Sequence, residues 1–198
     1  YLEERGFSRE LIEQYRIGWS LPNWDALTTL LERKGFSLAE MAQSGLVIQK
    51  ENRNEYFDRF RERIMFPVRD EAGHVIAFSG RVLTTESQDA KYMNSPESPI
   101  FQKSKVLYNL DVSRPIIRKK HKVIVMEGFM DVIAAAKAGI MNTVATMGTA
   151  LTKEQINKLK RLTDTVTICY DGDSAGFEAA KRAAQLLVQD KMKTEIAL

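Results

Sequence analysis

Two apolar segments of the chain each end in carboxylates and a glycine. Glu127 follows the apolar run 123–126, and Asp171 and Asp173 follow the largely apolar run 166–170. A buried strand has no need of acids at its end, whereas Mg²⁺ is held by one or two protein carboxylates together with water and substrate phosphates. The pattern therefore predicts a divalent metal site and metal-assisted chemistry on phosphate groups.

The segment that carries these acids alternates between short β-branched runs and helical patterns. We expect strands at 122–126, 142–146, 165–170 and 193–198, and helices at about 129–138, 152–162 and 174–189. Such alternation predicts βαβ units and a parallel sheet. The crevice of an open parallel sheet lies beyond the carboxyl ends of its strands, where Glu127, Asp171 and Asp173 fall. Asp131, about one helical turn after Glu127, is expected to face the same crevice.

These acids also have a purely structural interpretation. Asp131 and Asp173 can cap helices and complement helix dipoles, and for Asp173 this interpretation has the same weight as metal binding. Glu127 and Asp171 differ, because acids at neighbouring strand ends repel each other unless a metal neutralises them. We therefore expect the set to bind metal.

The amino-terminal half has a different pattern. Its first part predicts short helices capped by Ser8 and Ser37. Strands at 64–69 and 74–82 are expected to form a hairpin, in which Pro67 must occupy an edge or a bulge. We expect this half to be a mixed α+β subdomain.

A basic cluster with interleaved aromatic residues lies between these helices and the hairpin. Its arginines are Arg53, Arg59, Arg61 and Arg63, and its aromatic residues are Tyr56, Phe57 and Phe60. Arginines that follow phosphates and aromatic rings that stack on bases suit single-stranded nucleic acid. A half-buried strand with a solvated charged face explains the same spacing, and from spacing alone it is the better explanation.

Composition narrows the class of protein. The 198 residues include 44% hydrophobic and 28% charged residues, with a net charge of +3, which is typical of a soluble globular protein. The single cysteine, Cys169, excludes an internal disulfide and a cysteine-rich zinc site. We expect a cytoplasmic protein, because no apolar run is long enough to span a membrane. Trp19 and Trp24 are expected to lie in the core.

Several stretches resemble known families. Glu127-Gly128-Phe129-Met130-Asp131, followed by Tyr170-Asp171-Gly172-Asp173, resembles the TOPRIM domain of DnaG-type primases, type IA and II topoisomerases and some nucleases. The stretches 58–67, 78–81 and 91–97 resemble bacterial DnaG-type primases specifically, and with the TOPRIM motifs they cover most of the chain in the order of that family.

The resemblance implies a fold and an activity. The fold would be a TOPRIM-type parallel sheet flanked by helices over residues 116–198, preceded by a mixed α+β subdomain over 1–115. The activity would be synthesis of short RNA primers on single-stranded DNA by two-metal nucleotidyl transfer. Glu127 and Asp171 would be catalytic, and Mg²⁺ or Mn²⁺ would be held by Glu127, Asp171, Asp173 and Asp131.

The resemblance also implies binding residues and partners. Positions that line the nucleotide and template crevice of the family are matched by Arg81, Lys91, Tyr92, Asn94 and Lys103, and the resemblance favours binding by Arg59, Arg61 and Arg63. An alternative interpretation of Lys91 and Lys103 is that they are ordinary surface lysines. The implied partners are the DNA template, ribonucleoside triphosphates, the RNA–DNA product and a replicative helicase, the last through a domain outside this segment.

The family has parts that this segment does not include. A third acidic motif, Asp-Pro-Asp, is expected one strand after Asp171, and the chain stops inside that strand at Leu198. Zinc is expected only in the family's separate amino-terminal domain. Two alternatives therefore stay open: another TOPRIM enzyme, such as a nuclease or a topoisomerase fragment, and a binding module for nucleotides or nucleic acid that is inactive on its own.

Overall fold

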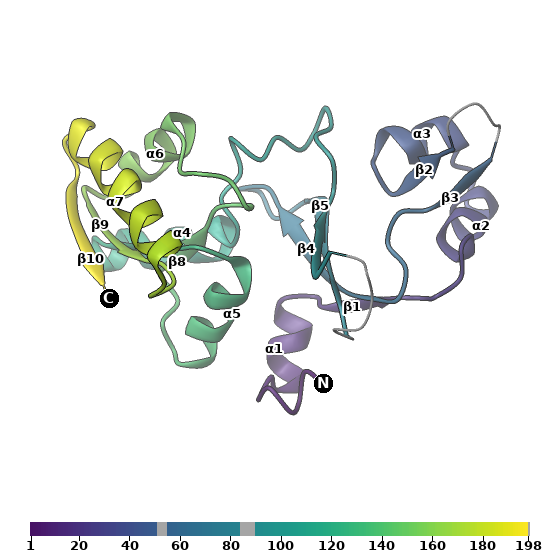
Figure 1. The fold of residues 1–198 in the computed structure, drawn as a ribbon, viewed down its shortest axis with the longest axis horizontal. Coiled ribbons are helices and arrows are strands. Elements are labelled where there is room, and N and C mark those ends of the chain that lie inside the picture. The colour runs from purple at the N-terminus through teal and green to yellow at the C-terminus, as the bar shows by residue number, and fades with distance from the viewer. Residues whose placement is uncertain (51–54, 84–89, 198) are drawn as a thin grey trace. The chain divides into compact units, whose positions relative to one another are not determined.

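The computed structural model describes residues 1–50, 55–83 and 90–197. Two compact units are formed (Figure 1): unit 1 consists of Tyr1–Val68 and Val75–Phe101, and unit 2 consists of Arg69–His74 and Gln102–Leu198. Among the described residues, no helix has the length and apolar character needed to cross a bilayer. The predicted division into functional subdomains at 115/116 stays a prediction, while the contacts place the boundary of the units after Phe101.

Unit 1 combines short helices with two small sheets. The sheets have the strand orders β1-β4-β5-β6 and β2-β3, and the pairs β1–β4, β5–β6 and β2–β3 are antiparallel. The elements are α1 (Arg9–Gln14), β1 (Gly18–Ser20), α2 (Ala26–Arg33), α3 (Leu38–Gln43), β2 (Val47–Gln49), β3 (Tyr56–Asp58), β4 (Arg63–Arg69), β5 (Val75–Val82) and β6 (Tyr92–Asn94).

Local capping explains where two of these helices begin. The Ser8 hydroxyl accepts a hydrogen bond from the backbone N–H of Leu11 at 3.3 Å, which starts α1. Ser37 and Glu40 form a reciprocal capping box at the start of α3. Both predicted N-caps are therefore confirmed, as expected for an interaction that involves only residues close in sequence.

Helix α2 begins in a different way, because its own N-cap residue, Asp25, makes no side-chain capping bond. The buried carboxylate of Asp58, at the end of β3, accepts hydrogen bonds from the backbone N–H groups of Leu27 at 2.6 Å and Thr28 at 2.8 Å. The Thr28 hydroxyl donates to the same carboxylate at 2.6 Å. Asp58 therefore caps α2 from a distant strand and joins the helix to β3.

Pro67 lies in β4, which has a strand on each side in the sheet order. The register pairs Gly18 with Met65, so β1 ends before it reaches Pro67. At this position β4 has only one neighbouring strand, β5, which makes it a local edge. The expectation that Pro67 occupies an edge is confirmed.

Unit 2 is a parallel α/β fold. Its sheet has the order β10-β9-β7-β8, and all three pairs are parallel. The elements are α4 (Leu110–Lys120), β7 (Val123–Met126), α5 (Phe129–Lys137), β8 (Thr143–Ala145), α6 (Lys153–Lys160), β9 (Thr165–Cys169), α7 (Ser174–Gln189) and β10 (Lys193–Ala197). Each predicted strand and helix of this segment is present, and α4 is an additional helix.

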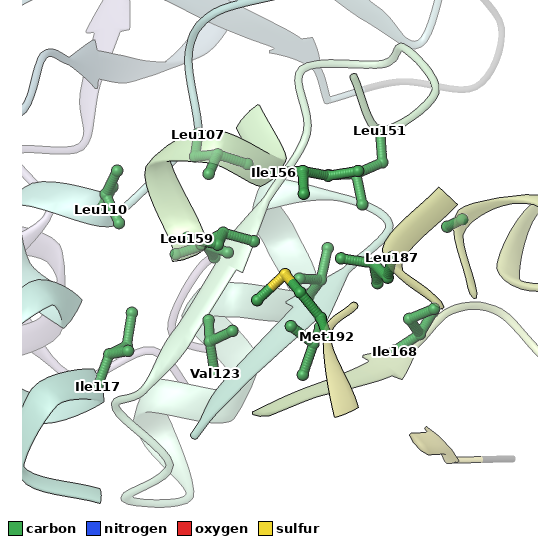
Figure 2. Close-up of a cluster of buried hydrophobic side chains, with 14 of the residues drawn as sticks. Leu107, Leu110, Ile117, Val123, Leu151, Ile156, Leu159, Ile168, Leu187 and Met192 are labelled. Atoms are coloured by element: carbon green, nitrogen blue, oxygen red, sulfur yellow. The ribbon is translucent and has the colours of Figure 1, made fainter. Parts of the chain in front are cut away.

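The core of unit 2 is a continuous apolar cluster (Figure 2). It joins Val123 of β7 and Ile168 of β9 to side chains from α4, α6 and α7, including Ile117, Leu159 and Leu187. Helix α5 contributes no residue to this cluster, although its own Val132 and Ile133 are fully buried. Burial of β7, β8 and β9 explains why they read as β-branched apolar runs in the sequence, whereas the edge strand β10 is largely exposed.

Ion pairs attach the turn between β4 and β5 to the helices of unit 2. Arg69 pairs with Asp111 at 3.0 Å, and both side chains are largely buried. Glu71 pairs with Lys158 at 2.9 Å and with Arg114. Burial opposes ionisation of Glu71, but these two cations outweigh it and lower its pKa. The turn is therefore held to α4 and α6 by charge.

Candidate active site and nucleic-acid interface

The acidic residues of unit 2 lie where the strand order reverses. The chain passes from β7 to β8 on one side and then returns to β9 on the other side of β7. Such a reversal is a topological switch point, and ligands of open α/β sheets bind outside the carboxyl ends of the strands there. Met126 at the end of β7 pairs with Cys169 at the end of β9, so the acids that follow these residues are neighbours.

Glu127 and Asp171 are connected through the backbone. The N–H of Asp171 donates a hydrogen bond to Oε2 of Glu127 at 3.1 Å. Both side chains are exposed at the edge of the sheet. Glu127 is therefore oriented by one oxygen, while its second oxygen and the carboxylate of Asp171 can reach a ligand.

Asp131 and Asp173 are both helix caps in this structure. Oδ2 of Asp131 accepts from the Gly128 N–H at 3.0 Å, and Oδ1 of Asp173 accepts from the Gly176 N–H at 2.7 Å. Burial raises the pKa of Asp131, and the negative charge of Asp171 raises it further. The prediction that these acids cap helices is therefore confirmed, while metal binding by them stays a prediction, and Asp131 also lies close enough to Asp171 for their charges to interact.

The acidic edge, which consists of Glu127, Asp171 and Asp173 at the carboxyl ends of β7 and β9, fits an open metal site. Within the described part of the chain, no group of three or more candidate ligand side chains is gathered closely enough to hold an ion by itself. In the same part of the chain, no Lys or Arg forms a salt bridge with Glu127, Asp171 or Asp173, so their negative charge is not neutralised by the protein. Mg²⁺ commonly uses one or two carboxylates and completes its shell with water and substrate phosphates. The carboxylates present fit that kind of site.

Gly176 allows helix α7 to start close to Asp171. A Cβ atom at this position would lie 2.9 Å from the carbonyl carbon of Asp171 and closer still to its oxygen. A Cβ at Gly172 would meet nothing within 4 Å. Only a glycine at position 176 therefore allows the two backbone segments to approach so closely.

An exposed aromatic platform in unit 1 combines Trp24, Phe57 and Arg61. The Arg61 guanidinium lies 3.9 Å from the centroid of the Trp24 ring and 5.4 Å from that of Phe57. The two rings meet edge to face at 5.5 Å. Trp24 is 62% exposed, so the prediction that it belongs to the core is wrong, as it is for Trp19 at 44%.

A second basic and aromatic cluster surrounds Arg81. Its Nε donates to the hydroxyl of Tyr92 at 3.2 Å, and its guanidinium lies 4.5 Å from the centroid of the Tyr1 ring. Arg81 is only 6% exposed, and its Nη1 atom is buried without a hydrogen-bond partner among the described residues. The exposed Lys91 lies 5.8 Å from the centre of the Tyr92 ring, and Asn94 ends the same strand, β6.

Comparison with known proteins now identifies the family. The family described as "DNA primase catalytic core, N-terminal domain" matches residues 1–114, and the family described as "Toprim-like" matches residues 124–198. The chain belongs to the DNA primase catalytic-core family. It has a Toprim fold in unit 2, as the resemblance implied.

Whole primases and solved primase structures support this assignment. A DNA primase of Halalkalibacterium halodurans is 48% identical over all 198 residues, which make up 33% of that protein. A primase domain from Pseudomonas aeruginosa is 40% identical with a TM-score of 0.88, over 99% of this chain and 61% of that one. A DnaG primase catalytic domain bound to ssDNA is 39% identical with a TM-score of 0.87, over 100% of this chain and 62% of that one. The chain thus spans about a third of the length of its whole primase relative.

The structure separates the arginines that the resemblance grouped together in this primase-family chain. Arg63 is 2% exposed and donates to the carbonyl oxygens of Gly80 and Ala90. It therefore supports the sheet from within, which corrects the prediction that it lies at a binding surface. Arg59 donates to the Gly45 carbonyl at 2.7 Å, and burial lowers its pKa. Arg53 lies outside the described residues, as does Leu198.

Lys103 belongs to unit 2, together with the acidic edge, whereas Arg81 and Lys91 belong to unit 1. The backbone carbonyl of Lys103 accepts from the side chain of Gln155 at 3.1 Å, which holds this position to α6. Sequence reasoning missed the role of Trp24. The signal was present in the aromatic residues near Arg61, but the pairing joins side chains that are far apart in the chain.

Proposed function

We propose that this chain is part of the catalytic core of a DNA primase, which joins ribonucleotides on a single-stranded DNA template. The observation that supports this most directly is the pair Glu127 and Asp171 at the switch point of the Toprim sheet, linked by one hydrogen bond and not neutralised by any described Lys or Arg. In the reaction, the 3′ hydroxyl of one nucleotide attacks the α-phosphate of the next, and pyrophosphate leaves.

The carboxylates would divide the work at the acidic edge. Asp171 and Asp173 would hold Mg²⁺ or Mn²⁺, with Glu127 as a further ligand or as the acceptor of the proton from the attacking hydroxyl. Asp131 supports this set by closing the first turn of α5. When bound, the metal would neutralise the charge that develops on the phosphate oxygens.

The Trp24, Phe57 and Arg61 platform would bind the DNA template. An exposed indole offers a stacking surface to any base, and Arg61, held over the ring, adds a positive charge for the phosphate backbone. The family member that was solved with ssDNA supports a template-binding role for this fold.

Nucleotide phosphates would be bound by the remaining basic residues. Lys91 and Tyr92 lie beside Arg81 in unit 1, and Lys103 lies in unit 2. The substrates would be ribonucleoside triphosphates and the product an RNA–DNA hybrid. In the full-length parent, other segments would carry a zinc-binding domain and the contact with a replicative helicase at the bacterial replication fork.

The conservative change Glu127→Gln tests the proposed activity. In the full-length parent it should lower primer synthesis at least ~100-fold while leaving DNA affinity nearly unchanged, because the size is kept and only charge and basicity are lost. Asp164→Asn, at the opposite end of β9, is the matched control and should leave synthesis intact. Normal synthesis by Glu127→Gln would remove Glu127 from the mechanism, and a parent that binds DNA and nucleotides without making primers would be a binding module.

A further inference from the structure

A pocket of about 290 Å³ opens beside Glu127, entirely within unit 2. It lies at the carboxyl ends of β7, β8 and β9 and along one face of α7. Pockets for whole small molecules usually have volumes of about 300–1,000 Å³. A pocket of this size is large enough for one sugar or one nucleoside.

The walls of the pocket are mainly apolar. Leu151 and Ala183 come from the buried core, where Figure 2 shows Leu151, and Ala179 and Leu186 extend the apolar wall along α7. Among the described residues that line the pocket, Arg182 alone is positively charged, and it lies on an exposed position of the helix. The lining is therefore poorly suited to a phosphate group and better suited to the uncharged part of a nucleotide.

Two hydroxyl groups in the lining have no protein partner. Thr146, directly after β8, is only 4% exposed, and its hydroxyl makes no hydrogen bond with any described residue. The hydroxyl of Tyr170, directly after β9, also has no hydrogen-bond partner in the described part of the chain. Neither hydroxyl oxygen is among the buried polar atoms that lack a partner in the described residues, so both open onto the pocket. Each is therefore free to form a hydrogen bond with a ligand there, and its removal would leave a ligand hydroxyl unpaired.

We propose that this pocket holds the ribose of a nucleotide bound at Glu127, and that the hydroxyls of Thr146 and Tyr170 bind the ribose 2′ hydroxyl. The inference rests on the proposed function, which places Glu127 at the attacking 3′ hydroxyl. The 2′ carbon of a ribose is bonded to the 3′ carbon, so a 3′ hydroxyl at Glu127 brings the 2′ hydroxyl to the mouth of the pocket. Thr146 and Tyr170 thereby become specificity residues that favour RNA over DNA at the reacting end.

The energetic consequence is selective for the sugar. A site built to bind a substrate hydroxyl rejects the analogue without it, because the protein groups are left unpaired. The 2′ hydroxyl is also the group by which proteins distinguish RNA from DNA. Removing one protein hydroxyl should therefore slow the reaction of the ribose form and leave that of the deoxyribose form nearly unchanged.

Primer extension by the full-length parent tests the inference. Extension is measured from a primer ending in a ribonucleotide and from the same primer ending in a 2′-deoxyribonucleotide, and a third arm uses 2′-deoxynucleoside triphosphates to show which sugar is read. Tyr170→Phe and Thr146→Val should each lower the ratio of kcat/KM for ribose over deoxyribose about 10-fold, the effect of one lost hydrogen bond. Thr146→Ser, which keeps a hydroxyl, should restore the ratio, and Thr165→Val at the other end of β9 should not change it.

An unchanged ratio in both variants, or an equal loss with both sugars, would overturn the inference, since equal loss indicates a merely structural role. Thermal unfolding identifies a variant that fails to fold, and the other variant then decides. If the parent makes no primers, the proposed function fails separately. Binding then decides about the pocket: with Mg²⁺ present, the parent should bind a primer–template duplex more tightly when the primer ends in a ribonucleotide than when it ends in a 2′-deoxyribonucleotide, and Tyr170→Phe should abolish the difference. Equal binding of the two by the parent would refute the ribose site.

Discussion

The two units hold their functional groups in opposite ways. In unit 2, Glu127, Asp171 and Asp173 directly follow strands or precede a helix, and backbone N–H groups orient two of their carboxylates. In unit 1, the guanidinium groups of Arg61 and Arg81 lie against aromatic rings from other elements, and each also donates a hydrogen bond, Arg61 to the Asp58 carbonyl and Arg81 to the Tyr92 hydroxyl. The backbone places the acids precisely without neutralising them, which suits a metal ion. The exposed ring of Trp24 with the Arg61 cation over it presents a stacking face and a positive charge, which suits a flexible polyanion.

Removal of one of the proposed metal-binding carboxylates should have the largest effect. Asp171→Ala should lower the affinity for Mg²⁺ or Mn²⁺ at least ~100-fold, since even groups that only support metal ligands are worth about 10–100-fold. The fold should survive, because the side chain is exposed and contributes no apolar contact to the core. Metal titration, monitored by calorimetry, measures the effect. An affinity equal to that of the parent would contradict the assignment of Asp171.

The backbone placement of the acids is tested by Gly176→Ala. The added Cβ collides with the backbone of Asp171, so either the acid or the start of α7 must move. A displacement of about 1 Å at a reacting centre can cost ~100-fold in rate, and overpacking costs about 1–3 kcal/mol in stability. Primer synthesis and thermal unfolding measure the two effects. Gly172→Ala, with open space around its Cβ, is the control, and equal behaviour of the two variants would show that this close approach is unimportant.

The aromatic platform should respond to Trp24→Ala with a smaller loss. Base stacking on an aromatic side chain is worth about 1–3 kcal/mol per base, so affinity for single-stranded DNA should fall by that amount. Fluorescence anisotropy with an oligonucleotide measures it, and Trp19→Ala is the matched control because Trp19 carries no guanidinium over its ring among the described contacts. Equal losses in the two tryptophan variants would show that exposure alone, rather than the platform, explains binding.

The smallest expected effect concerns the pH dependence of stability. Burial, with the charge of Asp171, raises the pKa of Asp131 in the folded state, so the native state binds the proton more tightly than the unfolded state. The resulting stability is present below the unfolded pKa of about 3.9 and is lost as the pH rises through the folded pKa. Asp131→Asn should therefore raise the melting temperature at pH 7, and the gain should shrink towards pH 3.

Two further measurements sharpen that prediction. Added Mg²⁺ should stabilise the parent more than Asp131→Asn, because a nearby cation compensates the charge that burial disfavours. The exposed Asp25, which makes no capping bond, provides the control Asp25→Asn. If Asp131→Asn and the parent have the same melting temperature at every pH, then ionisation of Asp131 does not destabilise the folded state.

Local sequence patterns were sufficient to predict most elements of unit 2 and the starts of two helices in unit 1. The strands and helices fall within a few residues of their predicted ranges, because each is a short β-branched run or an amphipathic segment bounded by caps. Ser8 and Ser37 cap helices as predicted, since an N-cap involves only the next three residues. The meeting of Glu127 and Asp171 followed from a general rule of parallel sheets, given only that β7 and β9 are neighbours.

Contacts between distant residues could not be predicted in this way. Asp58 caps α2 from strand β3, Arg63 is buried against Gly80, and Trp24 is exposed and stacks with Arg61. Each of these residues lies where its type is seldom found, since Asp and Arg are usually exposed and Trp is usually buried. Only its neighbours in the fold explain the departure.

The sequence by itself therefore determined the class of fold, the approximate bounds of the elements around the parallel sheet and the position of the acids, because these depend on local periodicity and on the end of a strand. The tertiary structure decided which arginines are available to a ligand and which hydroxyls surround the pocket beside Glu127. Those properties depend on solvent exposure and on which strands become neighbours. Both are set by the packing of segments that lie far apart in the chain.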